Sequence, residues 1–148
     1  MDVYSTDDDL VAIRSNILLL GVDDWEQKHI DAKIYIDKII ESQWYRTTAL
    51  DNGIDYLETV FNADLLSDSG SQLKLLSCYK TLELIYVDLM KDTQEEDGFE
   101  RHSKFFGKLF DKELKNVLSI GLDYDWNLSG SISSDERQQP KKRRLRRS

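Results

Sequence analysis

Apolar residues recur every three to four positions along most of the chain, which is the period of an amphipathic helix. The clearest such stretch follows Gly21, where Asp23 or Asp24 is the expected N-cap and the helix is expected to end between Trp44 and Arg46. The face that this helix is expected to pack against the bundle consists of Trp25, His29, Ala32, Ile36, Ile39 and Ile40.

Two further long helices have the same period. One opens after the sequence SDSGS, and the other runs from about Asp97 to Gly121 with a stripe of phenylalanine residues. Their expected apolar faces consist of Leu75, Tyr79, Leu82, Tyr86 and Leu89 in the first, and of Phe99, Phe106, Phe110, Leu114 and Val117 in the second. A short helix is expected from the N-cap Thr6 to about Arg14, because three aspartates in its first turn favour the positive end of the helix dipole.

These elements predict an all-α fold, a small helical bundle of about four helices. The only proline, Pro140, lies near the C-terminus, so proline interrupts none of the predicted helices. Residues 1–122 are expected to form the helical bundle domain. Residues 123–148 are expected to form a turn and an extended basic tail.

A connection of residues 47–71 joins the second and third predicted helices and is longer than the ordinary loops of helical bundles. The sequence YLETVF within it is compatible with a short strand or an exposed hairpin. A loop of this length in a compact domain is typical of a binding arm.

Charge is divided along the chain, although the net charge is only −8. All 28 acidic residues and 14 of the 20 basic residues lie within residues 1–140, which therefore carry a charge of −14. The other six basic residues lie in residues 141–148 and give this tail a charge of +6. An acidic body with a basic tail is typical of a protein that makes contact through the tail while the body repels or stays solvated.

The sequence contains little that indicates catalysis or membrane binding. HExxH, GxSxG and glycine-rich phosphate motifs are absent. His29 is expected to pack in the bundle, His102 to lie on a helix surface among charges, and Cys78 to lie in the core. No apolar run approaches the length of about 18 residues that spans a membrane, and the N-terminus is acidic where a signal peptide is basic. We therefore expect a cytosolic protein that is not an enzyme and makes no membrane contact.

The sequence DWNLSGSISSDE, residues 125–136, has the spacing of a calcium-binding EF-hand loop. Its oxygen ligands would be Asp125, Asn127, Ser129, the carbonyl of Ser131 and Glu136, and a glycine at the sixth place would make the sharp turn. Gly121 ends the preceding helix too early for a complete EF-hand, and Pro140 leaves little room for a following helix, so a surface turn is the alternative. We expect no required cofactor; the cation that this loop could hold is a structural Ca²⁺.

The basic tail KKRRLRR admits several interpretations. It could bind nucleic acid through phosphates, serve as a nuclear address, dock on an acidic protein surface or remain a solvated tail. Leu145 among the arginines favours a docked peptide with one apolar anchor. A nucleic-acid-binding domain would normally spread positive charge over its folded face, whereas this body is acidic.

The order of these elements resembles the head-to-tail connector, or adaptor, proteins of tailed bacteriophages. The resemblance rests on the segments VYSTDDDLVAIRSNILLLGVDDWEQKHIDAKIYIDKII, LKLLSCYKTLELIYVDLM and DGFERHSKFFGKLFDKELKNVLSIGLDYDWNLSG, and on the terminal RRLRR. It covers most of the chain, is weakest over residues 46–70 and contains no catalytic signature.

The resemblance implies a structural virion protein. Proteins of this family are small helical bundles that form a homo-oligomeric ring, typically of twelve copies, beneath the portal protein at the capsid vertex. The ring extends the DNA channel and holds the next neck or tail protein, so it would lie in the virion neck after assembly in the host cytoplasm. Genomic DNA would pass without sequence-specific binding, since an acidic channel would not hold its phosphates.

The resemblance also assigns roles to individual residues. The C-terminal extension of these proteins commonly reaches the portal or a neighbouring subunit, and here the portal-binding residues would be Arg143, Arg144, Leu145, Arg146 and Arg147. The residues of the long connection that would contact a neighbouring subunit or the tail-side protein are Tyr56, Leu57, Val60 and Phe61. Residues 125–136 would form the hinge that redirects the chain into its tail.

Two other functions compete with this one. A small nucleic-acid-associated regulator would use its tail on DNA, and it predicts salt-sensitive binding to duplex DNA that is lost on removal of residues 141–148. A single-loop calcium-binding protein predicts a calcium-dependent rise in melting temperature that Asp125→Ala and Glu136→Ala abolish.

Overall fold

The computed structural model describes residues 3–20, 24–92, 97–132 and 136–137. Its α-helices are α1 (Asp7–Ile13), α2 (Glu26–Ile40), α3 (Arg46–Asp51), α4 (Lys74–Asp92) and α5 (Asp97–Ile120). Short 3-10 helices lie at Ile17–Leu19, Ala63–Leu65 and Ser67–Leu73. The described residues contain no strand beyond an isolated antiparallel bridge between Leu66 and Tyr124, so the predicted all-α fold is confirmed.

The cap of α1 is the one predicted from the sequence. The backbone N–H and the hydroxyl of Thr6 both donate to Asp9 Oδ2, at 2.8 and 3.1 Å. Lys74 adds an ion pair to Asp9, with Nζ 3.0 Å from Oδ1. Partial burial opposes the ionisation of Asp9, but the bonds from Thr6 and Lys74 outweigh it and hold the pKa of this carboxyl below its ordinary value.

The second predicted helix is longer than expected. Asp24 accepts the N–H of Glu26 as a cap would, at 3.1 Å, but the helix does not end near Trp44. A π-helical turn at Glu41–Tyr45 carries it on into α3. The reason is that the apolar face continues past the predicted end, as the complete burial of Trp44 and Ala49 shows. α2 and α3 therefore form one helical rod, and the bundle has about four helices as predicted.

The predicted bounds of the long connection, residues 47–71, are accordingly wrong. Residues 47–51 are helical, residues 52–62 form the irregular loop, and 3-10 helices occupy most of residues 63–73. The glycine at position 53, with φ of 72°, lets the chain leave the helix. The sequence YLETVF forms turns and neither a strand nor a hairpin.

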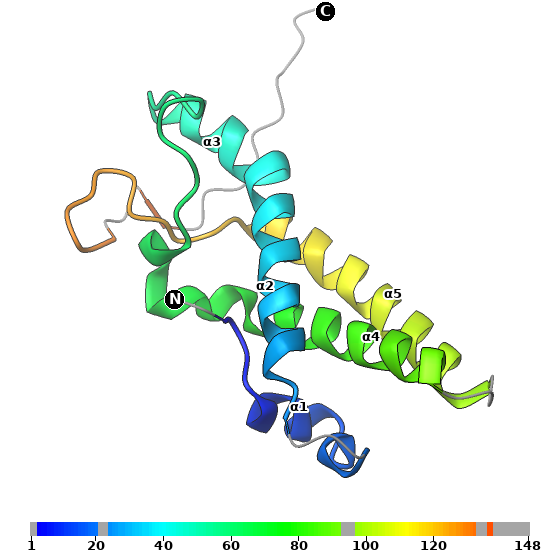
Figure 1. Ribbon diagram of the computed structural model, residues 1–148. Helices are drawn as coiled ribbons and strands as arrows, with labels where there is room; N and C mark the ends of the chain where they lie inside the picture. The colour runs from blue at the N-terminus through cyan, green and yellow to red at the C-terminus, as the bar shows by residue number, and fades with distance from the viewer. Residues whose placement is uncertain (1–2, 21–23, 93–96, 133–135, 138–148) are drawn as a thin grey trace, which may run out of the picture.

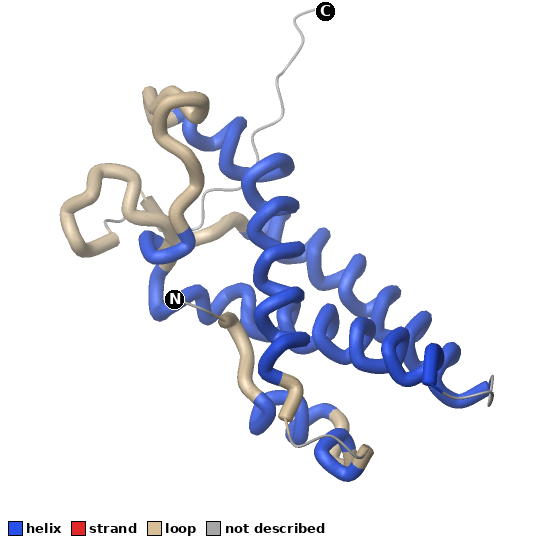
Figure 2. Tube along the Cα trace, in the orientation of Figure 1, coloured by secondary structure: helices blue, strands red, loops and turns tan. Residues whose placement is uncertain are grey.

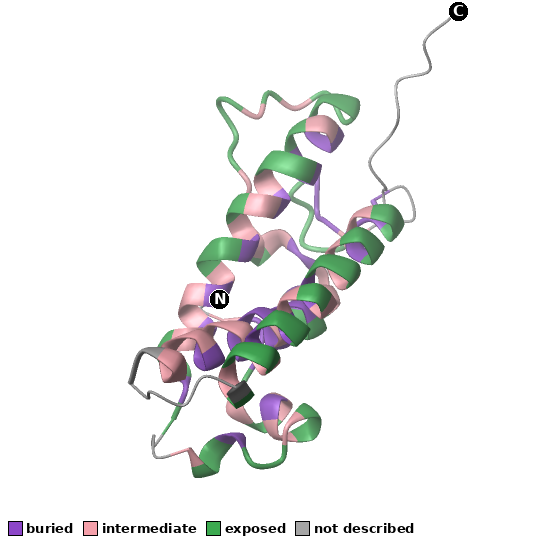
Figure 3. Cartoon of the chain, turned by 90° about the vertical axis from the view of Figure 1, so that its right-hand side faces the viewer, coloured by how far each residue is buried: buried purple, intermediate pink, exposed green. Residues whose placement is uncertain are grey.

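α4 and α5 lie side by side as an antiparallel pair, and α2 crosses them (Figures 1 and 2). Their apolar faces meet in the interior that Figure 3 marks as buried. Cys78 is buried there as predicted, and its burial raises the pKa of the thiol to about 11. Leu75 is 41% exposed, contrary to its predicted place on the apolar face, whereas Leu76, which was expected to broaden that face, is buried.

In the described part of the chain, every helix is too short or too polar to cross a lipid bilayer.

Candidate functional site

The chain that follows α5 is fixed to the bundle before it reaches the basic tail. Gly121, with φ of 88°, ends α5 as predicted. The backbone N–H of Ser67 donates to the carbonyl of Asp123, at 3.1 Å, and the N–H of Asp125 donates to the carbonyl of Leu65, at 3.0 Å. These two bonds tie residues 121–126 to the 3-10 helices that precede α4.

An aromatic cluster completes this attachment. It consists of Trp44, Tyr45, Phe61, Tyr124 and Trp126. The rings of Tyr45 and Trp126 are stacked, 9° from parallel with centroids 5.5 Å apart, and those of Tyr124 and Trp126 lie 4.5 Å apart. Burial raises the pKa of Tyr124 to about 12, although its hydroxyl accepts the N–H of Asn62. The predicted turn of residues 123 onward therefore begins inside the core, so the tail has a fixed starting point.

The predicted calcium loop is closed by its own backbone. Asp125 accepts the N–H of Ser129 at Oδ1, at 3.2 Å, and the N–H of Gly130 at Oδ2, at 2.8 Å. Glu136 Oε2 accepts the N–H of Asn127 at 3.1 Å, and the Ser129 hydroxyl donates to the carbonyl of Ser131 at 2.8 Å. The structure thus brings Glu136, the twelfth place of the predicted loop, to the backbone of Asn127, the third place.

Hydrogen bonds of this kind, from the backbone to nearby side chains, are typical of a tight polar turn, which is the alternative to a calcium loop. Both carboxylates, Asp125 and Glu136, are buried and accept hydrogen bonds from the loop. Among the described residues, no three His, Cys, Asp or Glu side chains lie close enough together to hold a metal ion. Calcium binding by this loop therefore stays a prediction, and residues 133–135 of the loop lie outside the described residues.

The four predicted contact residues of the long connection divide into two pairs. Tyr56 lies under the guanidinium of Arg46, 5.4 Å from the ring centroid, and Phe61 packs in the aromatic cluster. Leu57 and Val60 are 78% and 64% exposed, which is high for side chains of this size. The structure therefore leaves Leu57 and Val60 available to a partner, while Tyr56 and Phe61 are engaged in holding the loop.

The predicted portal-binding residues, Arg143, Arg144, Leu145, Arg146 and Arg147, lie outside the described residues.

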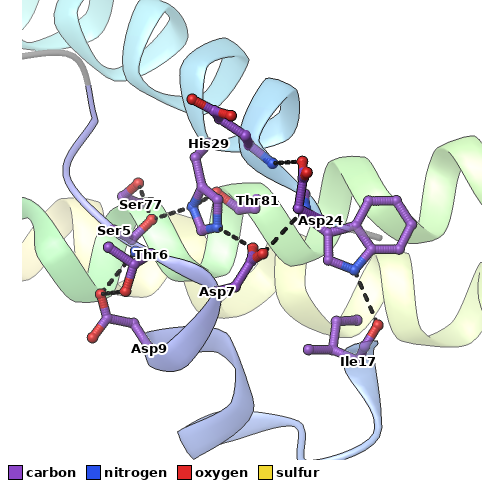
Figure 4. A network of polar contacts seen from close by, with 11 residues as sticks. Ser5, Thr6, Asp7, Asp9, Ile17, Asp24, His29, Ser77 and Thr81 are labelled. Carbon is purple, nitrogen blue, oxygen red and sulfur yellow. Dashed lines mark hydrogen bonds and ion pairs between the residues drawn. The ribbon is translucent and has the colours of Figure 1, made fainter. Parts of the chain in front are cut away.

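Residues 3–20, which we call the N-terminal arm, are joined to the bundle by a buried polar network that the sequence did not predict (Figure 4). Ser5 Oγ lies 2.7 Å from His29 Nδ1 and 2.7 Å from Ser77 Oγ, and His29 Nε2 lies 3.0 Å from Asp7 Oδ1. His29 is buried as predicted, but its partners could not be recognised because Ser5 and Ser77 lie 72 positions apart. The only signal was a histidine on an apolar face, which requires partners for both ring nitrogens.

The network borders a cavity of about 570 Å³. Serine, histidine and aspartate in this hydrogen-bond order also occur in hydrolase triads. Here, however, Ser5 is only 2% exposed and its hydroxyl is shared with Ser77, so the network covers the serine oxygen instead of presenting it to a substrate. We interpret the network as an attachment of the N-terminal arm to α2 and α4.

A second polar contact holds the far end of this arm. Arg14, directly after α1, donates from Nε to the Tyr86 hydroxyl at 3.1 Å and from Nη2 to His102 Nε2 at 2.9 Å. His102 is therefore half-buried against α1 and α4, and the charges around it include Arg14 and Arg101. Burial and these two cations lower its pKa below the ordinary 6.5.

Comparison of the sequence with protein-family models and with curated proteins, and of the structure with solved structures, finds no match.

Proposed function

We propose that this chain is a structural subunit of a tailed-phage adaptor ring, which joins the portal vertex of the capsid to the neck or tail and extends the DNA channel. The resemblance described above is the origin of the proposal. The all-helical bundle agrees with the fold that the resemblance implies, and its acidic body and basic C-terminal tail suit contact through the tail.

The observation that best supports the proposal is that residues 121–126, from which the tail extends, are fixed to the bundle. Residues 121–126 are held by backbone hydrogen bonds and by the aromatic cluster, so a pull on the tail would be transmitted to the bundle. The 15 positions from Trp126 to Lys141 span at most about 50 Å when extended. The six bases beyond them could therefore reach a neighbouring protein while the bundle keeps its place in a ring.

The side chains of the tail suit an acidic protein surface. Four of its six bases are arginines, whose planar guanidinium groups pair with carboxylates through two parallel hydrogen bonds. The net charge of −14 on residues 1–140 would meanwhile weaken contact with DNA, because phosphates are held by positive charge. DNA could then pass such a ring without being retained.

Co-sedimentation with the purified portal ring encoded alongside this chain tests the proposal. We expect the intact chain to sediment with the portal, and the chain truncated after Gln139 to stay in the supernatant. A matched variant with all four tail arginines replaced by lysine keeps the charge but loses the bidentate pairing, so it is expected to bind more weakly than the intact chain.

A parallel titration with duplex DNA distinguishes the adaptor function from its main alternative, a nucleic-acid-associated regulator. If the intact chain binds duplex DNA in a salt-sensitive manner, loses this binding on truncation and never sediments with the portal, the proposal is wrong and the tail serves nucleic acid.

A further inference from the structure

Five basic side chains follow one exposed face of α5. They stand at intervals of three or four residues, which places them in line along the helix, and they are Arg101, Lys104, Lys108, Lys112 and Lys115. We call this set the basic stripe. All five are exposed, and at about 1.5 Å per residue the stripe is roughly 21 Å long. Figure 3 shows the outer face of α5, exposed along most of its length.

Most side chains of the basic stripe, unlike most other bases of the bundle, form no ion pair with an acidic side chain in the described part of the chain. Elsewhere, most bases pair with acids, as in Lys28–Asp88, Lys33–Asp37, Lys74–Asp9 and Lys80–Glu83. Within the stripe, Lys104 pairs with Glu100 at 2.9 Å, while the other four have no ion pair within the described part of the chain. A protein whose residues 1–140 carry −14 thus concentrates uncompensated positive charge on one helix.

Apolar side chains accompany this charge. Phe105 lies on α5 beside the basic stripe and is 55% exposed, and Ile120, at the end of the helix, is 54% exposed. A partner that covers the stripe would therefore also bury apolar surface, as the centre of a protein interface does. We expect it to carry both carboxylates and apolar side chains.

The segment of residues 50–60, which is the end of α3 and most of the irregular loop after it, carries this combination of side chains. Its exposed acids are Asp51, Asp55 and Glu58, and its exposed apolar residues are Leu50, Leu57 and Val60. We call it the acidic loop. The Tyr45 hydroxyl donates to the carbonyl of Thr59 at 2.5 Å, which ties the acidic loop to the bundle.

We propose that the acidic loop of one copy docks on the basic stripe of a second copy. The acidic loop lies beyond α3 at one end of the molecule and α5 lies away from it in both views (Figures 1 and 3), so the two surfaces of one copy do not meet each other. Each contact therefore leaves one loop and one stripe free for further copies. Such head-to-tail contacts close into rings when the rotation between copies permits. The inference rests on the proposed function and names the surfaces that would build its ring.

A second copy fits the basic stripe better than nucleic acid does. Glu100 and Asp111 lie exposed along the edge of the stripe and would repel phosphates, as would the acidic body. A phosphate backbone would bury little of the apolar surface of Phe105 and Ile120, whereas Leu57 and Val60 of a second copy would bury it against apolar side chains.

Zero-length cross-linking tests the pairing directly. A carbodiimide joins a lysine amine to a carboxylate that it touches, and a mixture of ¹⁴N-labelled and ¹⁵N-labelled full-length protein identifies links between copies by their mixed mass. We expect mixed-mass links from Lys108 or Lys112 to Asp55 or Glu58. Mixed-mass links that avoid these four residues would overturn the pairing.

Charge reversal supplies a second test, with self-association measured by sedimentation at low salt. K108E/K112E and D55K/E58K are each expected to weaken association about tenfold or more, because like charges then face each other. The chain with all four substitutions exchanges the charges of the two surfaces, so opposite charges face each other again, and we expect its self-association to be restored. K38E/R137E, which makes the same change in net charge at two exposed bases outside the basic stripe, is the matched control and should associate as the unaltered chain does.

The outcomes separate this inference from the proposed function. Rings on the portal without the expected links would leave the adaptor function standing and refute the pairing. The expected links in a protein that never binds a portal would support the pairing and refute the adaptor function. If K108E/K112E abolishes binding to duplex DNA and leaves self-association unchanged, the stripe serves nucleic acid and the pairing is refuted.

Discussion

The N-terminal arm, residues 3–20, and the C-terminal segment, residues 121–126, are attached to the bundle by different interactions. In the arm, Leu10 and Ile17 are buried, but polar contacts fix its position: Ser5 and Asp7 hold His29, and Arg14 holds His102. In the C-terminal segment, the rings of Tyr124 and Trp126 are buried in the aromatic cluster, with Trp126 stacked on Tyr45.

The two kinds of attachment respond to different changes. A hydrogen-bond network fails when one partner is removed or changes its protonation, because the remaining buried groups lose their bonds. Ring burial scales with area and does not depend on pH over the physiological range. The attachment of the C-terminal segment is therefore the less sensitive of the two to pH, which suits the base of the proposed docking tail.

The largest effect is expected at the aromatic cluster. Trp126→Ala should lower the free energy of unfolding by about 3–5 kcal/mol, because it removes a buried indole and leaves a cavity. Trp126→Phe is the control: the indole N–H is buried without a partner in the described part of the chain, so its removal offsets part of the lost contact. Chemical denaturation measures both. Equal losses for the two variants would contradict the assignment of the stability to ring burial.

A glycine under the N-terminal arm should give the next largest effect. Gly70 has φ of 74°, and an added Cβ would lie 2.7 Å from Tyr4 Cε1 and 2.8 Å from Cδ1. Gly70→Ala should therefore cost about 2–4 kcal/mol, from backbone strain and displacement of the ring. Gly53→Ala, with φ of 72° and no atom within 4 Å, isolates the strain and should cost about 1–2 kcal/mol. A similar loss in both would mean that Tyr4 moves aside freely and that the arm is held loosely.

The buried network should contribute less than the ring cluster. His29→Ala is expected to cost about 2 kcal/mol, because Ser5 and Asp7 lose the ring nitrogens to which they bond. A double-mutant cycle with Ser5→Ala, followed by denaturation, should give a coupling of about 1 kcal/mol. Strictly additive losses would show that the two side chains do not act as one network.

The smallest expected effect is a dependence of stability on pH through the arm. The pKa of His102 is lowered in the folded state, so the native protein binds protons less readily than the unfolded chain. The stability from this site should be complete above about pH 6.5 and be lost as pH falls through the lower, folded pKa. His102→Gln keeps an acceptor for Arg14 without titrating, so its stability should change less over this range. Parallel curves for both proteins would exclude His102 as the cause.

The helical elements could largely be predicted because they depend on local spacing. The cap at Thr6, the burial of Cys78 and the end of α5 at Gly121 all follow from residues close together in sequence. The error at α2 arose because the π turn at Glu41–Tyr45 breaks the three-to-four period while Trp44 and Tyr45 remain buried. A search for one regular period therefore ends the helix too early.

Contacts that join distant parts of the chain could not be predicted. Neither the partners of His29 nor the stacking of Tyr45 on Trp126 has a signal in the spacing of residues. The basic stripe did have one, since Arg101, Lys104 and Lys108 stand at helical intervals. The charge summed over residues 1–140 is strongly negative and hides this stripe, because a sum does not show how charge is distributed over single helix faces.

The adaptor function is tested most directly by electron microscopy of the portal ring mixed with the intact chain and with the chain truncated after Gln139. We predict an added ring of density on the portal with the intact chain and a bare portal with the truncated one. A portal that stays bare with the intact chain, while that chain binds duplex DNA, would contradict the adaptor function.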